Sequence, residues 1–120
     1  MSAYVINHLR LPGGVPNEEG LAYLEQVEET VRAYGGRWLA QGEPQVVEGA
    51  WPGLAVLLEF PGMAEARSWY DSPAYRKILP LRVNNAVSDL IFVDGVGPGF
   101  TVAGFAQQIR ASIAADAAEG

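Results

Sequence analysis

The sequence has no cysteine and only one histidine, and these two shortages exclude several kinds of site. Without cysteine the chain forms no disulfide, has no thiolate nucleophile and offers no thiolate ligand to a metal. A single histidine, His8, cannot build a multi-histidine zinc or iron centre within one chain. We therefore expect no metal site, and the missing cysteines are typical of a reducing compartment. No motif carries a cofactor signature such as a glycine-rich phosphate loop, so we also expect no cofactor.

Positive charge is also scarce, with 8 Lys and Arg residues against 14 Asp and Glu and a net charge of -6. This balance repels phosphate backbones and anionic lipid. No run of about 18 apolar residues occurs, and the first residues lack the basic and apolar regions of a secretion signal. We expect no nucleic acid partner, no membrane attachment and a cytoplasmic location.

The 120 residues are 49% hydrophobic and 18% charged, which is sufficient for one folded domain and leaves no room for a second. We place this domain at residues 1–96. The remaining residues, 97–120, begin with Gly97-Pro98-Gly99 and form a C-terminal tail with one expected helix.

The order of the expected elements indicates the fold class. Residues rich in β-branched and aromatic types predict strands at 3–9, at 37–48 with a break at 42–44, at 54–60 and at 89–95. Apolar residues at helical spacing predict helices at 18–34, 63–71, 73–87 and 103–118, with Asn17 and Ser72 as N-caps and Pro80 dividing the third helix in two. This βαββαβ order predicts an α+β fold of the ferredoxin-like type, with an antiparallel sheet and its helices on one side.

One face of that sheet would be left uncovered. It would hold residues such as Tyr4 or Val5, Trp38 or Leu39, and Leu57 or Leu58. Soluble monomers rarely expose an apolar patch of this size. The pattern therefore predicts a homodimer that forms through the sheets.

Several short motifs resemble the domain of unknown function 1330 family from about residue 3 to residue 96. They are Tyr4-Val5-Ile6-Asn7-His8, Gly35-Gly36-Arg37-Trp38-Leu39, Glu48-Gly49-Ala50-Trp51-Pro52, Glu59-Phe60-Pro61 and Ala66-Arg67-Ser68-Trp69-Tyr70-Asp71-Ser72-Pro73-Ala74-Tyr75. The resemblance implies a dimeric α/β barrel, in which two ferredoxin-like subunits pack their sheets together. It implies no activity, because the family has none established.

Three polar residues match family positions. His8 could act as an acid or base next to a carbonyl, although a structural histidine bonded to a carboxylate is the favoured alternative. Arg37 and Arg82 could clamp a ligand carboxylate, or pair internally with Glu59 or Glu48.

Aromatic residues on the second helical segment add further candidates. Trp69 and Tyr75 have the helical spacing of core residues, but the Tyr75 hydroxyl could enter a cleft between the helices and the sheet. Haem-degrading monooxygenases of the same superfamily resemble this chain in Asn7 and Trp69. They also require a histidine after this helix, where the chain has Arg76 and Lys77, which argues against haem.

Three functions remain open. In the first, the chain is a small-molecule-binding protein or a metal-free enzyme, with a small acidic or aromatic ligand in a pocket between sheet and helices and His8, Arg37, Tyr75 and Arg82 as polar groups. In the second, it is a cofactor-free monooxygenase or isomerase of the dimeric α/β-barrel type. In the third, it is a dimeric accessory protein without catalysis. Whether the chain is an enzyme is undecided by its sequence.

Overall fold

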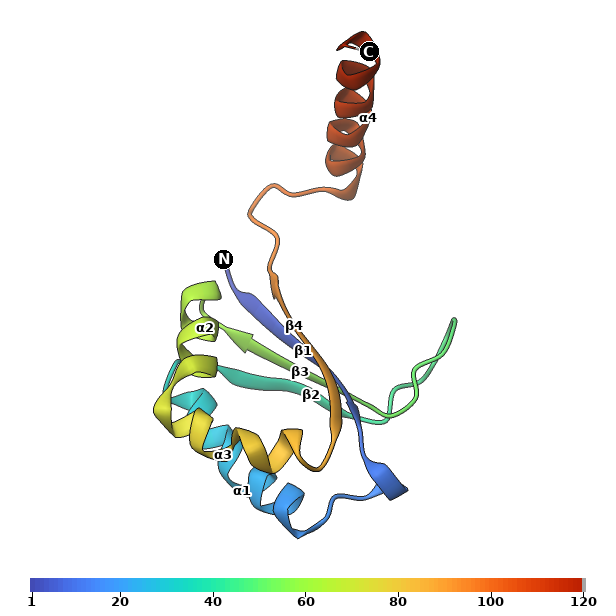
Figure 1. Ribbon diagram of the computed structural model, residues 1–120. Coiled ribbons are helices and arrows are strands. Elements are labelled where there is room, and N and C mark those ends of the chain that lie inside the picture. Colours follow the sequence, from blue (N-terminus) through green and yellow to red (C-terminus); the bar gives the residue numbers. More distant parts are fainter. Residues whose placement is uncertain (120) are drawn as a thin grey trace.

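The structure is a computed structural model that describes residues 1–119 as an α+β unit followed by a separate C-terminal helix (Figure 1). Its elements in chain order are β1 (Ala3–Arg10), the 3-10 turn η1 (Pro12–Gly14), α1 (Glu18–Arg32), β2 (Arg37–Gly42), β3 (Leu54–Phe60), α2 (Met63–Asp71), α3 (Pro73–Val83), β4 (Val87–Asp94) and α4 (Val102–Glu119).

The sheet has the strand order β2-β3-β1-β4, and every neighbouring pair is antiparallel. Helices α1, α2 and α3 all cover the same face (Figure 1). The predicted ferredoxin-like fold is therefore confirmed. Val5 lies opposite Leu58 and points toward the helices, whereas Ile6 lies opposite Leu57 and Ile91. We call the side that carries Ile6, Leu57 and Ile91 the outer face.

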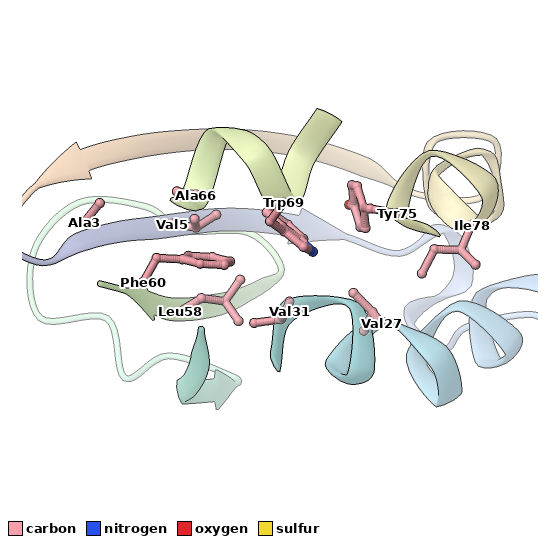
Figure 2. Close-up of a cluster of buried hydrophobic side chains, with 10 residues drawn as sticks. All are labelled: Ala3, Val5, Val27, Val31, Leu58, Phe60, Ala66, Trp69, Tyr75 and Ile78. Atoms are coloured by element: carbon pink, nitrogen blue, oxygen red, sulfur yellow. The ribbon is translucent and has the colours of Figure 1, made fainter. Parts of the chain in front are cut away.

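The core lies between the helices and the sheet, and three aromatic side chains occupy its centre (Figure 2). The Trp69 ring packs against Phe60 and Tyr75, with ring centroids 5.3 and 4.3 Å apart. Its Nε1–H donates to the Thr30 hydroxyl at 3.0 Å, so the one polar group of this buried side chain is satisfied. This bond also ties α2 to α1.

Local sequence signals set the ends of α1 as expected. The Asn17 side chain accepts a hydrogen bond from the Gly20 backbone N–H at 2.9 Å. At the other end Gly35 adopts φ +78°, and the Gly36 N–H bonds the Val31 carbonyl at 3.1 Å. A Cβ atom on Gly36 would lie 2.6 Å from Phe60, so the chain here packs closely on the core.

Two predicted details are wrong. Pro80 does not divide α3, which runs unbroken to Val83. The missing N–H of Pro80 removes a single helical bond close to the end of the helix, where the loss is small. The second half of the strand predicted at 37–48 is a loop, because β2 ends at Gly42 and residues 43–53 extend beyond the sheet without a partner strand (Figure 1). We call residues 43–53 the β2–β3 loop.

Helix α4 stands clear of the sheet and of the other helices (Figure 1), and none of its residues is buried. Phe105, Ile109 and Ile113 follow one another at four-residue intervals and are all exposed. No helix within residues 1–119 has both the length and the apolar character needed to cross a membrane.

Candidate functional site

A cavity of about 160 Å³ lies between the helix-covered face of the sheet and helices α1 and α3. Its wall combines Asn7 of β1, Tyr23 of α1, Trp38 of β2, Trp69 of α2 and Arg82 of α3 with aliphatic side chains. Among the described residues that line it there is no histidine, aspartate or glutamate. The cavity is therefore a mostly apolar space with a few polar groups, the usual composition of a small-molecule site.

Arg82 enters the cavity wall from the last turn of α3 and is only 6% exposed. Its Nη2 donates to the Tyr75 hydroxyl at 3.3 Å, and its Cζ lies 5.9 Å from the centre of the Tyr23 ring. The buried Nε–H has no acceptor, and Arg82 takes part in no ion pair within residues 1–119. A guanidinium is always charged, so this is a buried cation without a counter-ion.

The two tyrosines beside Arg82 do not neutralise it. Their hydroxyl oxygens lie 2.8 Å apart and share a hydrogen bond. Burial, and secondarily the neighbouring Tyr75, raises the pKa of the Tyr23 hydroxyl above its usual range. Tyr23 therefore stays protonated at neutral pH and offers the guanidinium a ring face and a dipole, without a negative charge.

Asn7 contributes the second unpartnered polar group of the cavity. Its side chain comes from the centre of β1 and is 6% exposed, and its buried Oδ1 has no hydrogen-bond partner. Trp38, in contrast, is already satisfied, because its Nε1–H donates to Gln41 Oε1 at 2.7 Å. The cavity thus presents two buried polar side chains, Asn7 and Arg82, each with an atom left unpaired.

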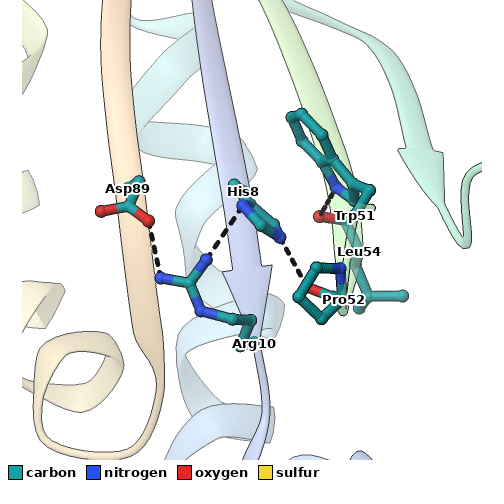
Figure 3. A network of polar contacts seen from close by, with 6 residues as sticks. All are labelled: His8, Arg10, Trp51, Pro52, Leu54 and Asp89. Carbon is teal, nitrogen blue, oxygen red and sulfur yellow. Dashed lines mark hydrogen bonds and ion pairs between the residues drawn. The ribbon is translucent and has the colours of Figure 1, made fainter. Parts of the chain in front are cut away.

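His8 lies on the outer face, in a separate polar cluster with Arg10, Asp89 and the end of the β2–β3 loop (Figure 3). Arg10 Nη1 lies 2.9 Å from His8 Nδ1 and can only donate, so Nδ1 is the acceptor. The proton of the neutral ring is then on Nε2, 2.5 Å from the Pro52 carbonyl oxygen. Trp51 covers the ring at a centroid distance of 4.2 Å. Both ring nitrogens of His8 are thus engaged in contacts within the cluster.

The other charged side chains of the outer face form ion pairs with one another. Arg10 bonds Asp89 at 2.6 Å and holds the pKa of that carboxyl below its usual range. Arg37 bonds Glu59 at 2.7 Å, the internal pairing considered from the sequence, and this hydrogen bond is the main cause of the lowered pKa of Glu59.

The structure thus separates the six residues singled out from the sequence. Asn7, Trp69 and Arg82 line the cavity, and Tyr75 supports Arg82 from the core. His8 and Arg37 lie outside the cavity. Alternate residues of a strand point to opposite faces of the sheet, and these two side chains lie on the outer face.

Several cavity residues were missed by sequence reasoning, among them Tyr23, Gln41 and Asn85. Tyr23 precedes Val27 by four residues and so shares the buried side of α1, which is the signal that would have found this residue.

Comparison of the sequence with protein families gives one match, a family described as "Domain of unknown function (DUF1330)", over residues 2–96. No curated protein matches the sequence significantly.

Solved structures of similar fold share little sequence with the chain. A protein of unknown function from Rhodopseudomonas palustris has 21% identity and a TM-score of 0.62, over 81% of this chain and 84% of that one. SnoaB, a cofactor-independent oxygenase from Streptomyces nogalater, has 9% identity and a TM-score of 0.54, over 83% and 97%. A dimeric ferredoxin-like protein of unknown function from Bacteroides fragilis has 16% identity and a TM-score of 0.50, over 78% and 96%. These likenesses are of fold.

Proposed function

The chain belongs to the domain of unknown function 1330 family, and we propose that it is a small-molecule-binding protein whose ligand occupies the cavity between the sheet and α1 and α3. One observation carries the proposal: Asn7 and Arg82 are both buried in the cavity wall, and each has a polar atom without a partner. Leaving such an atom unpaired costs about 1–3 kcal/mol, and more for a charged group. A bound ligand would supply the missing partners.

Binding is better supported than acid–base catalysis. The ionisable groups among the described lining residues are Tyr23 and Arg82, and both hold their protons at neutral pH. The alternative of a cofactor-free monooxygenase or isomerase is supported by the fold shared with SnoaB, described as a cofactor-independent oxygenase. Oxygen consumption with a bound aromatic compound would favour that alternative, and recovery of the compound unchanged would favour a binding protein.

The protein is proposed to act as a homodimer that forms through the outer face. Ile91 and Val93 are 52% and 41% exposed there, next to Ile6, Tyr4 and Leu57 of the adjoining strands. An uncovered apolar sheet face of this kind favours association. The dimeric state described for the Bacteroides fragilis protein of the same fold supports it.

Light scattering coupled to gel filtration tests the dimer. The wild type should elute with twice the mass of the chain, and Ile91→Asp should elute as a monomer. Val47→Asp is the matched control, because Val47 is 88% exposed on the β2–β3 loop. A dimer that survives Ile91→Asp, or a monomeric wild type, would contradict this interface.

A thermal-shift screen tests the binding site, using aromatic acids, lactones, quinones, flavins and haem. A ligand present at about 100 times its Kd adds about 2.7 kcal/mol of stability, which raises the Tm by several degrees. The shift should be lost in Asn7→Leu and kept in Arg37→Gln, which changes only the outer face. If no compound raises the Tm, the third function, a dimeric accessory protein, becomes the better description.

A further inference from the structure

The charge of the cavity indicates the charge of its ligand. Arg82 is the single charged side chain among the described residues that line it, in a chain whose net charge is -6. No carboxylate within residues 1–119 pairs with it, and the neighbouring Tyr75 hydroxyl already shares a hydrogen bond with Tyr23. The guanidinium fork matches a carboxylate, which accepts two parallel N–H bonds. The chemistry that completes this site is therefore a small planar anion.

The dimensions of the cavity limit the rest of the ligand. Its volume of about 160 Å³ is close to the roughly 150 Å³ known to accommodate benzene in a protein interior. Flavin and haem are several times too large for it. The lining includes two tryptophans, Trp38 and Trp69, and several aliphatic side chains, an apolar wall against which an aromatic ring packs well. One ring with small substituents fills this space.

Asn7 adds a preference for a polar substituent on that ring. Its Oδ1 is buried in the wall and accepts no hydrogen bond. A ring hydroxyl both donates and accepts, so it can satisfy the Asn7 amide. We infer that the ligand is a single-ring aromatic monocarboxylate, with its carboxylate on Arg82, its ring against the apolar wall and a ring hydroxyl toward Asn7. This inference rests on the proposed binding function.

Three probes of the same shape and different charge test the carboxylate. Isothermal titration at pH 7, in a buffer without carboxylate or phosphate, would compare benzoate, benzamide and benzamidinium on the wild-type chain. Benzoate should bind at least tenfold more tightly than benzamide, and benzamidinium should not bind. This comparison needs no variant, so a folding defect cannot obscure it.

Two variants then assign the contacts to residues. Arg82→Met should abolish the preference for benzoate over benzamide, and Arg37→Gln, on the outer face, should leave it unchanged. Asn7→Leu should remove any advantage of hydroxybenzoates over benzoate and keep the preference for an anion. Circular dichroism confirms that each variant is folded before titration.

The outcomes separate this inference from the proposed function. If benzamide binds as tightly as benzoate, or the preference persists in Arg82→Met, the cavity is a binding site but its ligand is not a carboxylate. If none of the three probes binds, while a compound of another class gives a shift that Asn7→Leu removes, the carboxylate inference is again overturned and the proposed function stands. If no compound of any class binds, both fail.

Discussion

Replacing Arg82 with methionine is expected to stabilise the protein, although it removes a hydrogen bond. The bond from Nη2 to the Tyr75 hydroxyl is long, at 3.3 Å, and is worth about 1 kcal/mol. Its loss leaves no buried hydroxyl without a hydrogen-bond partner, because the Tyr75 hydroxyl keeps the 2.8 Å bond to the Tyr23 hydroxyl. Methionine has a similar length and retains most of the packing of the arginine stem.

The gain comes from removing a buried charge. Holding an ion away from water costs several kcal/mol when no counter-ion is present, and water that enters the cavity reduces this penalty. Replacing buried ionic groups by apolar residues of similar volume stabilises proteins by about 1–4 kcal/mol in favourable cases. For Arg82→Met we expect the lower half of that range, about 1–2 kcal/mol, because the guanidinium retains one hydrogen bond and a ring contact.

Calorimetry of both chains without ligand checks this prediction. A gain of about 1–2 kcal/mol corresponds to a Tm higher by about 4–10 °C for a domain of this size. Arg32→Met is the control, because the Arg32 side chain on α1 is 69% exposed and its ion pair with Glu28 contributes little. A Tm for Arg82→Met several degrees below that of the wild type would refute the reasoning. Arg82 would then stabilise the fold, and its burial would no longer indicate a ligand.

Three further predictions concern the core. Trp69→Ala should lower the free energy of unfolding by about 3–5 kcal/mol in urea denaturation, since the indole is 1% exposed and donates a hydrogen bond to Thr30. A loss below about 1 kcal/mol would contradict this prediction. Gly36→Ala should cost about 1–3 kcal/mol, because its Cβ would lie 2.6 Å from Phe60, and an unchanged Tm would show that the chain relaxes without strain. The pKa of Tyr23 is raised in the folded state, so the free energy of unfolding keeps the full contribution of Tyr23 below a pH of about 10 and loses it as the pH rises further. Tyr23→Phe should make this loss of stability with pH less steep in urea denaturation. An equally steep loss in both chains would contradict the prediction.

Much of the fold follows from local signals, which is why it could be predicted. Asn17 and Ser72 each cap a helix with a side-chain oxygen, and Gly35 ends α1 in the left-handed conformation. The errors at Pro80 and in the β2–β3 loop have a different origin. Whether a proline interrupts a helix depends on the number of turns that follow it, and whether an extended segment becomes a strand depends on a neighbouring strand to pair with.

The site was predicted less completely, because β1 is apolar on both faces. Val5 and Leu9 alternate with Tyr4 and Ile6, so the pattern does not show which set faces the helices. That choice decides whether Asn7 or His8 enters the cavity. The Arg82–Tyr75 contact, in contrast, was accessible from the sequence, since two residues seven apart lie on the same side of a helix.

The separate position of α4 determines which spectroscopic signal reports on the stability of the domain. An isolated helix of 18 residues is marginally stable in water and loses its structure gradually on heating. Circular dichroism at helical wavelengths therefore sums two processes, the broad melting of α4 and the cooperative unfolding of the domain. Trp38, Trp51 and Trp69 are the three tryptophans of the chain, and all of them precede the tail. Tryptophan emission thus follows the domain alone, and the two signals should give transitions that do not coincide.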